Sequence, residues 1–255
     1  MTTLNLILAL LPCLLLLWWF HARDKRPEPH HVIWVTFFLG IGTVIPVVLT
    51  AVPVLWLVGE IESDYLSGIW QAFMIAAIPE EFFKFLVLLL YCTRHRAFDE
   101  PMDGLVYGAV ASLGFATFEN VLYVFEGGIV AALMRAVTAV PGHACLGAIM
   151  GYYVGQARFH RVGKRYNYFM ALLVPIVLHG LYDFPLLSLA SMTDPATGEL
   201  PADVSETTIL LLMAGALAVF VVEVVWTLIL VRRLRHEQDH IPRVEPADKW
   251  PDESR

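Results

Sequence analysis

The chain has 255 residues, of which 58% are hydrophobic and only 16% are charged. An ordinary soluble domain has roughly 45 to 50% apolar and about 25% charged residues, so the composition excludes a typical soluble globular protein. The formal net charge of -7 argues against a nucleic-acid partner, which would require a basic surface. The three cysteines lie in apolar stretches, and we interpret them as small packing residues rather than disulfide partners or a metal cluster.

Long apolar stretches follow one another along most of the chain, and each is near or above the roughly 20 residues that cross the hydrocarbon core of a bilayer. They cover residues 4–20, 32–58, 69–92, 103–125, 129–156, 169–190 and 208–231. We therefore predict an all-α polytopic bundle of about seven transmembrane helices. The first stretch lacks the basic flank and small-residue cleavage site of a signal peptide, so we expect a retained helix.

The basic residues fall on alternate connections between these stretches. Of the 17 Lys and Arg residues, 15 lie outside the predicted spans, and the opposite connections 59–68, 126–128 and 191–207 contain acids but no Lys or Arg. Because Lys and Arg are retained on the cytoplasmic side, the pattern predicts an outer N-terminus and a cytoplasmic C-terminus. We expect one bundle over residues 1–231 and a charged, mostly disordered cytoplasmic tail over 232–255.

Ionisable groups inside the predicted spans are candidates for function, because a charge at mid-bilayer costs roughly 2.5 to 3.5 kcal/mol even on insertion scales. Nine qualify: Glu80, Glu81, Lys84, Glu119, Arg135, His143, His179, Asp183 and Glu223. Arg135 lies near the outer end of its span, where we expect its side chain to snorkel to the interface. We expect Glu223, which has no acidic or histidine neighbour in its span, to be structural.

The spacing in "PEEFFKF" puts both glutamates within reach of one lysine. Lys84 follows Glu80 by four residues and Glu81 by three, so either carboxylate can pair with it on one helical face. We predict a structural ion pair between Glu81 and Lys84. Glu80 is then the carboxylate that is free for chemistry.

Three further spans carry polar groups at comparable depth, about 9 to 21 Å below the outer end at 1.5 Å per residue. His179 and Asp183 share a face in "LHGLYDF", as do Phe115 and Glu119 in "GFATFENVLY". His143 follows a Pro-Gly pair in "VPGHACLGAIMGYYVG". The same segment carries a small-residue stripe, Gly147, Gly151 and Gly155, where another helix can approach closely.

Three functions use carboxylates and imidazoles inside a bilayer. A proton- or ion-coupled transporter would use them as a relay. A light-driven pump would need a lysine for retinal in the last span, which has none. A hydrolase would use a glutamate or a bound metal to activate water. Transporters often have two halves with paired, broken segments, and the absence of such symmetry favours the hydrolase.

The motifs "PEEFFK", "DGLVYGAVASLGFATFEN", "VPGHACLGAIMGYYVG" and "LHGLYDF" together resemble the PrsW family of intramembrane proteases. This family is related to the type II CAAX prenyl proteases and the bacterial CPBP proteins. The resemblance covers about residues 70–190, with the motifs in order on four successive spans. It implies an integral protein of the bacterial inner membrane whose partners are the lipid bilayer and a membrane-protein substrate, in some members an anti-sigma factor. The sequence indicates no oligomeric state.

Transferred to this sequence, the resemblance implies that Glu80, Glu81, Glu119 and His179 are catalytic. In the related CAAX proteases a glutamate and a histidine activate water, while a histidine and an asparagine hold the oxyanion. This sequence departs from that pattern, since Glu119 stands where the relatives have histidine and Asp183 where they often have asparagine.

The departure adds carboxylates to one low-dielectric site. They require either a divalent metal or shared protons to be stable together. Glu119, His143, His179 and Asp183 are acceptable Zn²⁺ ligands, although the sequence contains no HExxH motif. The sequence leaves a metal-dependent and a glutamate-only mechanism open.

Overall fold

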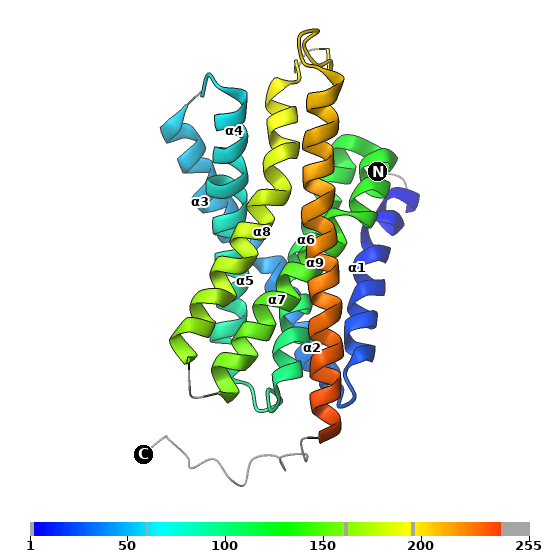
Figure 1. The fold of residues 1–255 in the computed structure, drawn as a ribbon. Helices are drawn as coiled ribbons and strands as arrows, with labels where there is room; N and C mark the ends of the chain where they lie inside the picture. Colours follow the sequence, from blue (N-terminus) through cyan, green and yellow to red (C-terminus); the bar gives the residue numbers. More distant parts are fainter. Residues whose placement is uncertain (1–2, 60, 161–162, 195–196, 241–255) are drawn as a thin grey trace.

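The computed structural model describes residues 3–59, 61–160, 163–194 and 197–240, and it contains only helices within these ranges (Figure 1). The α-helices are α1 (Thr3–Arg23), α2 (His30–Gly42), α3 (Val44–Val58), α4 (Asp64–Trp70), α5 (Ile78–Leu90), α6 (Pro101–Val137), α7 (Ala139–Phe159), α8 (Lys164–Met192) and α9 (Glu206–His240). A π-helix, η1 (Gln71–Ala77), joins α4 to α5, and a 3₁₀ turn, η2 (Cys92–Arg94), follows α5. The predicted polytopic helical bundle is confirmed.

Six helical segments of the described chain are long and apolar enough to cross a membrane, and one of them combines α2 with α3. The predicted span 69–92 is the exception, because it consists of α4, η1 and α5 in succession. Pro79 lies in the first turn of α5 and has no N–H to donate to the carbonyl four residues earlier. The regular α-helical hydrogen-bond pattern is therefore interrupted just before the two glutamates of the PEEFFK motif.

Helix α6 is assigned as one helix of 37 residues, yet it cannot be straight. A guanidinium nitrogen of Arg135 lies 2.7 Å from Oε2 of Glu119. In a straight helix these residues would be about 24 Å apart along the axis, which their side chains cannot span. The chain therefore turns back between them, in the region where the sequence predicted a connection at 126–128.

Helices α6 and α7 pack with their backbones in contact through glycines. A β-carbon added at Gly151 would lie 1.8 Å from the carbonyl oxygen of Gly104, and one added at Gly108 would lie 2.0 Å from that of Gly147. Such approach is possible only where neither helix has a side chain at the crossing. The close approach predicted for the glycine stripe of residues 147–155 is confirmed, and α6 is the helix that makes it.

The last helix continues beyond the predicted end of the bundle. Helix α9 runs to His240, where Leu234 and Gln238 are buried. The expectation of a disordered tail from residue 232 is therefore wrong for residues 232–240, because these residues still have the bundle to pack against. Residues 241–255 lie outside the described residues.

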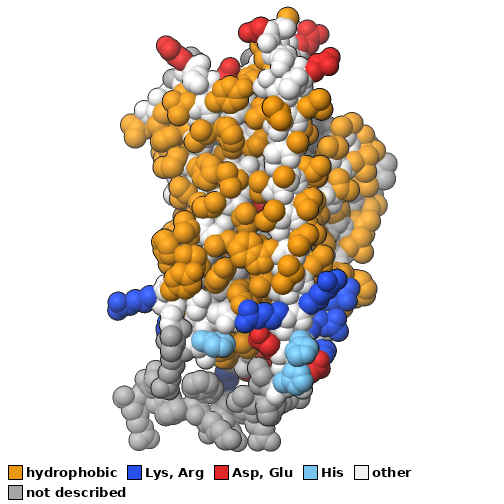
Figure 2. All heavy atoms as spheres, in the orientation of Figure 1, with side chains coloured by type: hydrophobic (Ala, Val, Ile, Leu, Met, Phe, Trp, Pro, Cys, Tyr) orange, Lys and Arg blue, Asp and Glu red, His pale blue; other side chains and the backbone are white. Residues whose placement is uncertain are grey.

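The surface has a wide hydrophobic band between two polar ends. In Figure 2 acidic side chains gather at one end of the molecule, and Lys and Arg side chains gather at the other. This separation agrees with the charge pattern of the connections, while the direction in which the bundle crosses the membrane stays a prediction. The three cysteines are free and buried, as their apolar surroundings predicted.

Candidate active site

Helix α5 contributes two glutamates and a lysine to the interior of the bundle. Nζ of Lys84 lies 2.8 Å from Oε1 of Glu81 and 3.2 Å from Oε2 of Glu80. Lys84 and Glu81 are completely buried and Glu80 is 7% exposed. The ion pair that the spacing predicted is therefore present, and the same ammonium also reaches the second carboxylate.

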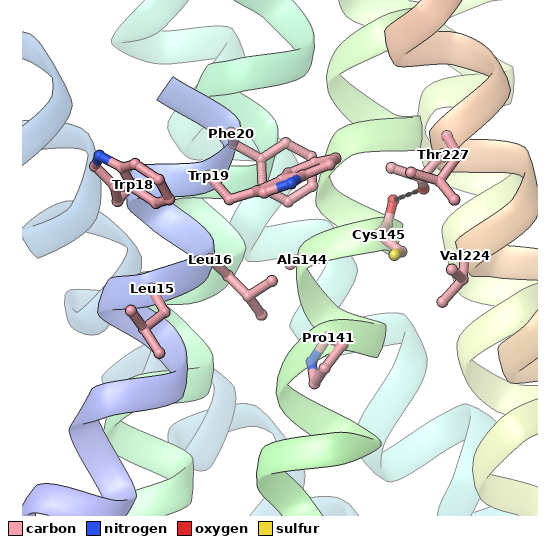
Figure 3. Close-up of a pocket in the computed structure, with 11 residues that line it drawn as sticks. Leu15, Leu16, Trp18, Trp19, Phe20, Pro141, Ala144, Cys145, Val224 and Thr227 are labelled. Atoms are coloured by element: carbon pink, nitrogen blue, oxygen red, sulfur yellow. Dashed lines mark hydrogen bonds between the residues drawn. The ribbon is translucent and has the colours of Figure 1, made fainter. Parts of the chain in front are cut away.

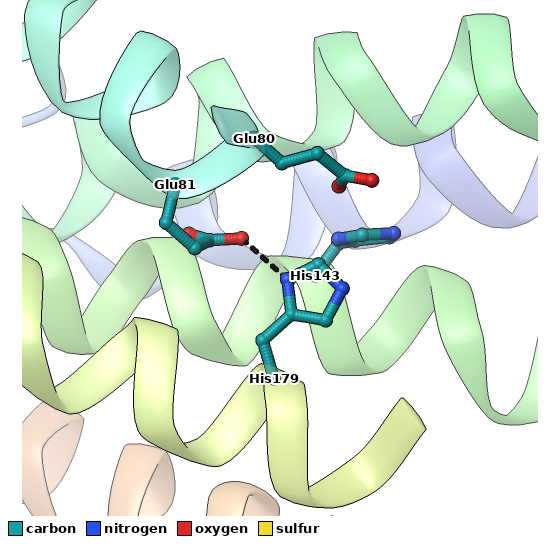
Figure 4. A group of neighbouring side chains, drawn as sticks. All are labelled: Glu80, Glu81, His143 and His179. Carbon is teal, nitrogen blue, oxygen red and sulfur yellow. Dashed lines mark hydrogen bonds and ion pairs between the residues drawn. The ribbon is translucent and has the colours of Figure 1, made fainter. Parts of the chain in front are cut away.

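Helix α8 brings His179 to this pair. Its Nδ1 atom lies 2.9 Å from Oε1 of Glu81, and its Nε2 atom lies 3.1 Å from Oδ2 of Asp183, one turn further along α8. Figure 4 shows the His179 ring directed from α8 toward Glu81 on α5. Each ring nitrogen thus faces a carboxylate, an arrangement that is satisfied when both nitrogens carry protons.

Helix α7 places His143 on the other side of the lysine. Nδ1 of His143 lies 3.2 Å from Nζ of Lys84, and Nε2 lies 2.8 Å from Oε2 of Glu119 on α6. Because an ammonium can only donate, Nδ1 is the acceptor, and the proton on the neutral ring lies on Nε2 and is donated to Glu119. The two imidazole rings lie 5.3 Å apart between centroids.

The ring of Phe115 presents its face to the lysine. Nζ of Lys84 is 4.1 Å from the centroid of this ring, and the ring also packs against His143 at 5.6 Å. The face that Phe115 and Glu119 share on α6 therefore points into the site, as their spacing predicted. A buried cation over an aromatic face is stabilised by the ring quadrupole, so Phe115 helps to keep the ammonium in place.

Every residue predicted for the site from the sequence is found in this connected network, but the grouping differs from the predicted ligand set. The potential ligand atoms that all lie within 4.8 Å of one another belong to Glu80, Glu81, His143 and His179 (Figure 4). Glu119 and Asp183 are outside this group. Each accepts from the Nε2 side of a histidine, which places them behind the rings.

One intramembrane charge, Arg135, departs from expectation. Arg135 does not snorkel: its side chain is 15% exposed, and it donates to Glu119 and, over 3.2 Å, to Oδ1 of Asn120. The tight return of the chain after Glu119 turns Arg135 inward. Asn120 was not singled out from the sequence, and it also donates over 2.8 Å to the carbonyl of Ala9 on α1. Glu223 is buried, and neither of its carboxylate oxygens has a hydrogen-bond partner among the described residues.

The four grouped residues fit a divalent metal by the chemistry of their donor atoms. Two carboxylates and two imidazoles are ligands that Zn²⁺ accepts, and a catalytic zinc uses about three of them with water in the remaining position. Oε2 of Glu81 is buried without a hydrogen-bond partner in the described part of the chain, so it is available as a ligand atom. Lys84 reaches three of the four side chains and would compete with the metal for them.

An apolar groove lies elsewhere in the bundle, between α1, α7 and α9. It has a volume of about 370 Å³, and Trp18, Trp19, Pro141 and Val224 are among its walls (Figure 3). Its polar feature is a 3.3 Å hydrogen bond from the hydroxyl of Thr227 to the carbonyl of Cys145. No residue that lines the groove is an acid, a base or a histidine, so the chemistry belongs to the cluster on α5 to α8.

Comparison with known sequences matches residues 28–220 to the family described as PrsW family intramembrane metalloprotease. A protein of Oceanobacillus iheyensis named Protease PrsW is 40% identical over 182 residues, which are 71% of this chain and 82% of the relative. The Protease PrsW of Bacillus subtilis is 38% identical over 71% of this chain and 81% of its own, and that of Clostridioides difficile is 34% identical over 71% and 78%. No solved structure matches the chain significantly.

The fold and the site together define a membrane-embedded enzyme whose acid–base groups are enclosed by a helical bundle. The sequence match extends over the helices that carry these groups. The chain belongs to the PrsW family of intramembrane proteases. This membership gives no support to the transporter alternative.

Proposed function

We propose that the chain is an intramembrane endopeptidase that hydrolyses a peptide bond in or near the membrane segment of another protein. The position of Glu80 carries this proposal. Its carboxylate is buried beside both histidines, and it accepts one hydrogen bond, over 3.2 Å, from Lys84. Glu81 is held by both Lys84 and His179, so Glu80 has the freer oxygen atoms to accept a proton from water.

The two carboxylates behind the histidines orient the imidazole rings. Glu119 accepts from Nε2 of His143 and is itself held by Arg135, while Asp183 accepts from Nε2 of His179. A carboxylate behind a histidine fixes the orientation and the tautomer of the ring. The Nδ1 atoms of both histidines are thereby directed toward the glutamates and lysine of α5. There they can hold a water molecule or polarise a substrate carbonyl.

For the metal-dependent form of the mechanism, we assign the ligands to Glu80, Glu81, His143 and His179, with Glu119 and Asp183 supporting the rings from behind. A bound Zn²⁺ would polarise the scissile carbonyl and make water more acidic. Each histidine would then use Nδ1 as its ligand atom and keep its Nε2 hydrogen bond. In the glutamate-only form, Lys84 remains the cation among the acids, and His179, oriented by Asp183 behind it, polarises the carbonyl.

The family resemblance favours a membrane-anchored regulator, such as an anti-sigma factor, as the substrate. The relatives from Oceanobacillus iheyensis and Bacillus subtilis are both named as proteases, and the match covers about four fifths of their length. A site enclosed by helices favours a substrate that reaches it from within or close to the bilayer. The substrate is therefore expected to have at least one apolar span.

Proteoliposomes that contain the purified chain and a library of fluorogenic single-span peptides test the proposal. We expect cleavage by the wild-type protein and by Glu206→Gln, a control at an exposed carboxylate at the beginning of α9. Glu80→Gln should incorporate equally well but not cleave. Absence of cleavage by the wild type across the library, or equal cleavage by Glu80→Gln, would contradict the proposal.

A further inference from the structure

A second group of buried carboxylates lies at the basic end of the bundle, remote from the candidate active site. Asp24 and Glu28 belong to the connection between α1 and α2, and Glu100 and Asp103 to the beginning of α6. Their exposed fractions are between 0 and 6%. The ends of α1 and α9 meet there, at the lower end of Figure 1. Gln238 of α9 donates from its amide to both Asp24 and Glu100.

The spacing of these oxygen atoms suits one cation. Asp24, Glu100 and Asp103 each offer a carboxylate oxygen within 4.8 Å of the other two. Oxygen ligands lie at 2.0 to 2.6 Å from Mg²⁺ or Ca²⁺, so two ligands of one ion can be up to about 5 Å apart. The three carboxylates are therefore close enough to share an ion without any rearrangement of the helices.

Hydrogen bonds satisfy only one oxygen of each aspartate. Oδ2 of Asp103 accepts from the backbone N–H groups of Asp99 and Glu100 at 2.8 and 2.7 Å, and Oδ1 of Asp24 accepts from the N–H of Arg26 at 2.8 Å. The second oxygen of each aspartate is buried and has no hydrogen-bond partner within the described chain. Leaving a buried acceptor unsatisfied costs about 1 to 3 kcal/mol, so these two oxygen atoms are available to a ligand.

The cluster has fewer cationic partners than carboxylates. Arg26 forms a 2.8 Å salt bridge with Glu100, Lys25 pairs with Asp239, and Tyr107 donates to Glu28. Within the described residues, the salt bridges leave Asp24, Glu28 and Asp103 without a cationic partner.

We propose that Asp24, Glu100 and Asp103 form a second metal site, for a hard divalent cation of the Mg²⁺ or Ca²⁺ class. Every candidate ligand atom is oxygen, which such ions prefer, whereas the intramembrane group includes two imidazoles that suit zinc. The ion ties the turn after α1 to the first turn of α6. Through Gln238, it also holds the end of α9 in place.

The test uses the full chain in detergent micelles, freed of metal by chelation and then titrated with MgCl₂ or CaCl₂. Bound ion is measured by equilibrium dialysis with atomic spectrometry, and stability is measured by thermal unfolding. At about 100 times the Kd we expect the melting temperature to rise by about 5 to 10 °C. Asp24→Asn and Asp103→Asn should bind one ion fewer than the wild type and lose most of this rise.

Each variant is compared with its own metal-free form, so a change in basal stability does not disturb the comparison. Asp103→Asn keeps a side-chain oxygen that can still accept the backbone N–H bonds at the beginning of α6. Glu80→Gln in the membrane centre and Glu199→Gln in an exposed loop should retain the full ion response. The proposal is overturned if the wild type binds no Mg²⁺ or Ca²⁺, if Glu80→Gln removes the response, or if acidification stabilises the protein and the ions do not.

Discussion

Nδ1 of His179 and Oε1 of Glu81 lie 2.9 Å apart, although 98 residues separate them in the chain. This contact links α8 to α5 and gives Glu81 a second partner besides Lys84. Adjacent glutamates in one motif thereby receive different environments, with Glu81 fixed between two helices and Glu80 held by one longer contact.

Replacement of Glu80 by glutamine should remove activity but keep the fold. The amide retains the size of the side chain but cannot accept a proton from water, so we expect the cleavage rate to fall at least about a hundredfold. The melting temperature should change little, because one 3.2 Å contact is lost. Cleavage rate and thermal unfolding measured on the same preparation test this assignment, and sustained proteolysis by the variant would refute it.

The ion pair between Glu81 and Lys84 can be measured by a double-mutant cycle. Breaking a buried pair from one side costs about 3 to 5 kcal/mol, so Glu81→Ala and Lys84→Ala should each lower the free energy of unfolding. Lys84→Ala should be the more harmful, since it also leaves Glu80 and His143 without their shared donor.

The double variant should be less damaged than the sum of the single variants by about 1 to 3 kcal/mol. Denaturant unfolding in micelles provides the values. Strictly additive losses would show that the two side chains do not interact in the folded protein.

Metal content separates the two mechanisms. If the centre holds zinc, His143→Ala and His179→Ala should each lose bound metal, and chelation should abolish cleavage until Zn²⁺ is returned. Asp183→Asn and Glu119→Gln should weaken metal affinity by about 10- to 100-fold, the effect of losing a carboxylate behind a ligand histidine. Metal affinity should also fall as the pH is lowered, because protons compete with the metal for the imidazole nitrogens.

Atomic spectrometry across these variants, combined with activity, gives the answer. Full activity of a wild-type preparation that contains no stoichiometric metal would exclude the metal-dependent form. The glutamate-only form would then be retained.

The glycine contact between α6 and α7 predicts a severe effect from a very small substitution. In Gly151→Ala the new methyl group would lie 1.8 Å from the carbonyl oxygen of Gly104, so the helices must separate, with a loss of about 1 to 3 kcal/mol or more. Gly42→Ala, in α2, is the matched control because an added β-carbon there would meet no atom within 4 Å apart from its chain neighbours and the nearby backbone of its own helix. Thermal unfolding of both variants tests this, and equal melting temperatures would contradict the packing.

Much of the candidate site was predictable because it follows from helical spacing. The separation of three or four residues that places Lys84 near both glutamates, and His179 near Asp183, is set by the helix itself. Contacts between helices were harder to predict from the sequence. The spacing did not indicate that Lys84 also reaches His143, nor that Arg135 turns inward to Glu119, because both depend on how the chain turns back between Glu119 and Arg135 within α6.

The carboxylate cluster at the ends of α1, α6 and α9 was missed for a related reason. Asp24, Glu100 and Gln238 are far apart in the sequence, and each alone is typical of a solvated connection or tail. The continuation of α9 to His240 was missed because a charged composition indicates disorder only when no packing surface is available.

The backbone contact between α6 and α7 also limits how the bundle can admit a substrate. Interlocked glycine rows cannot slide past each other in small steps, because any shift short of a full four-residue repeat, about 6 Å, drives a side chain into the opposing backbone. Glu119 lies on α6 and His143 on α7, so the glycine contact holds these two residues at the depth at which their side chains meet, 2.8 Å apart.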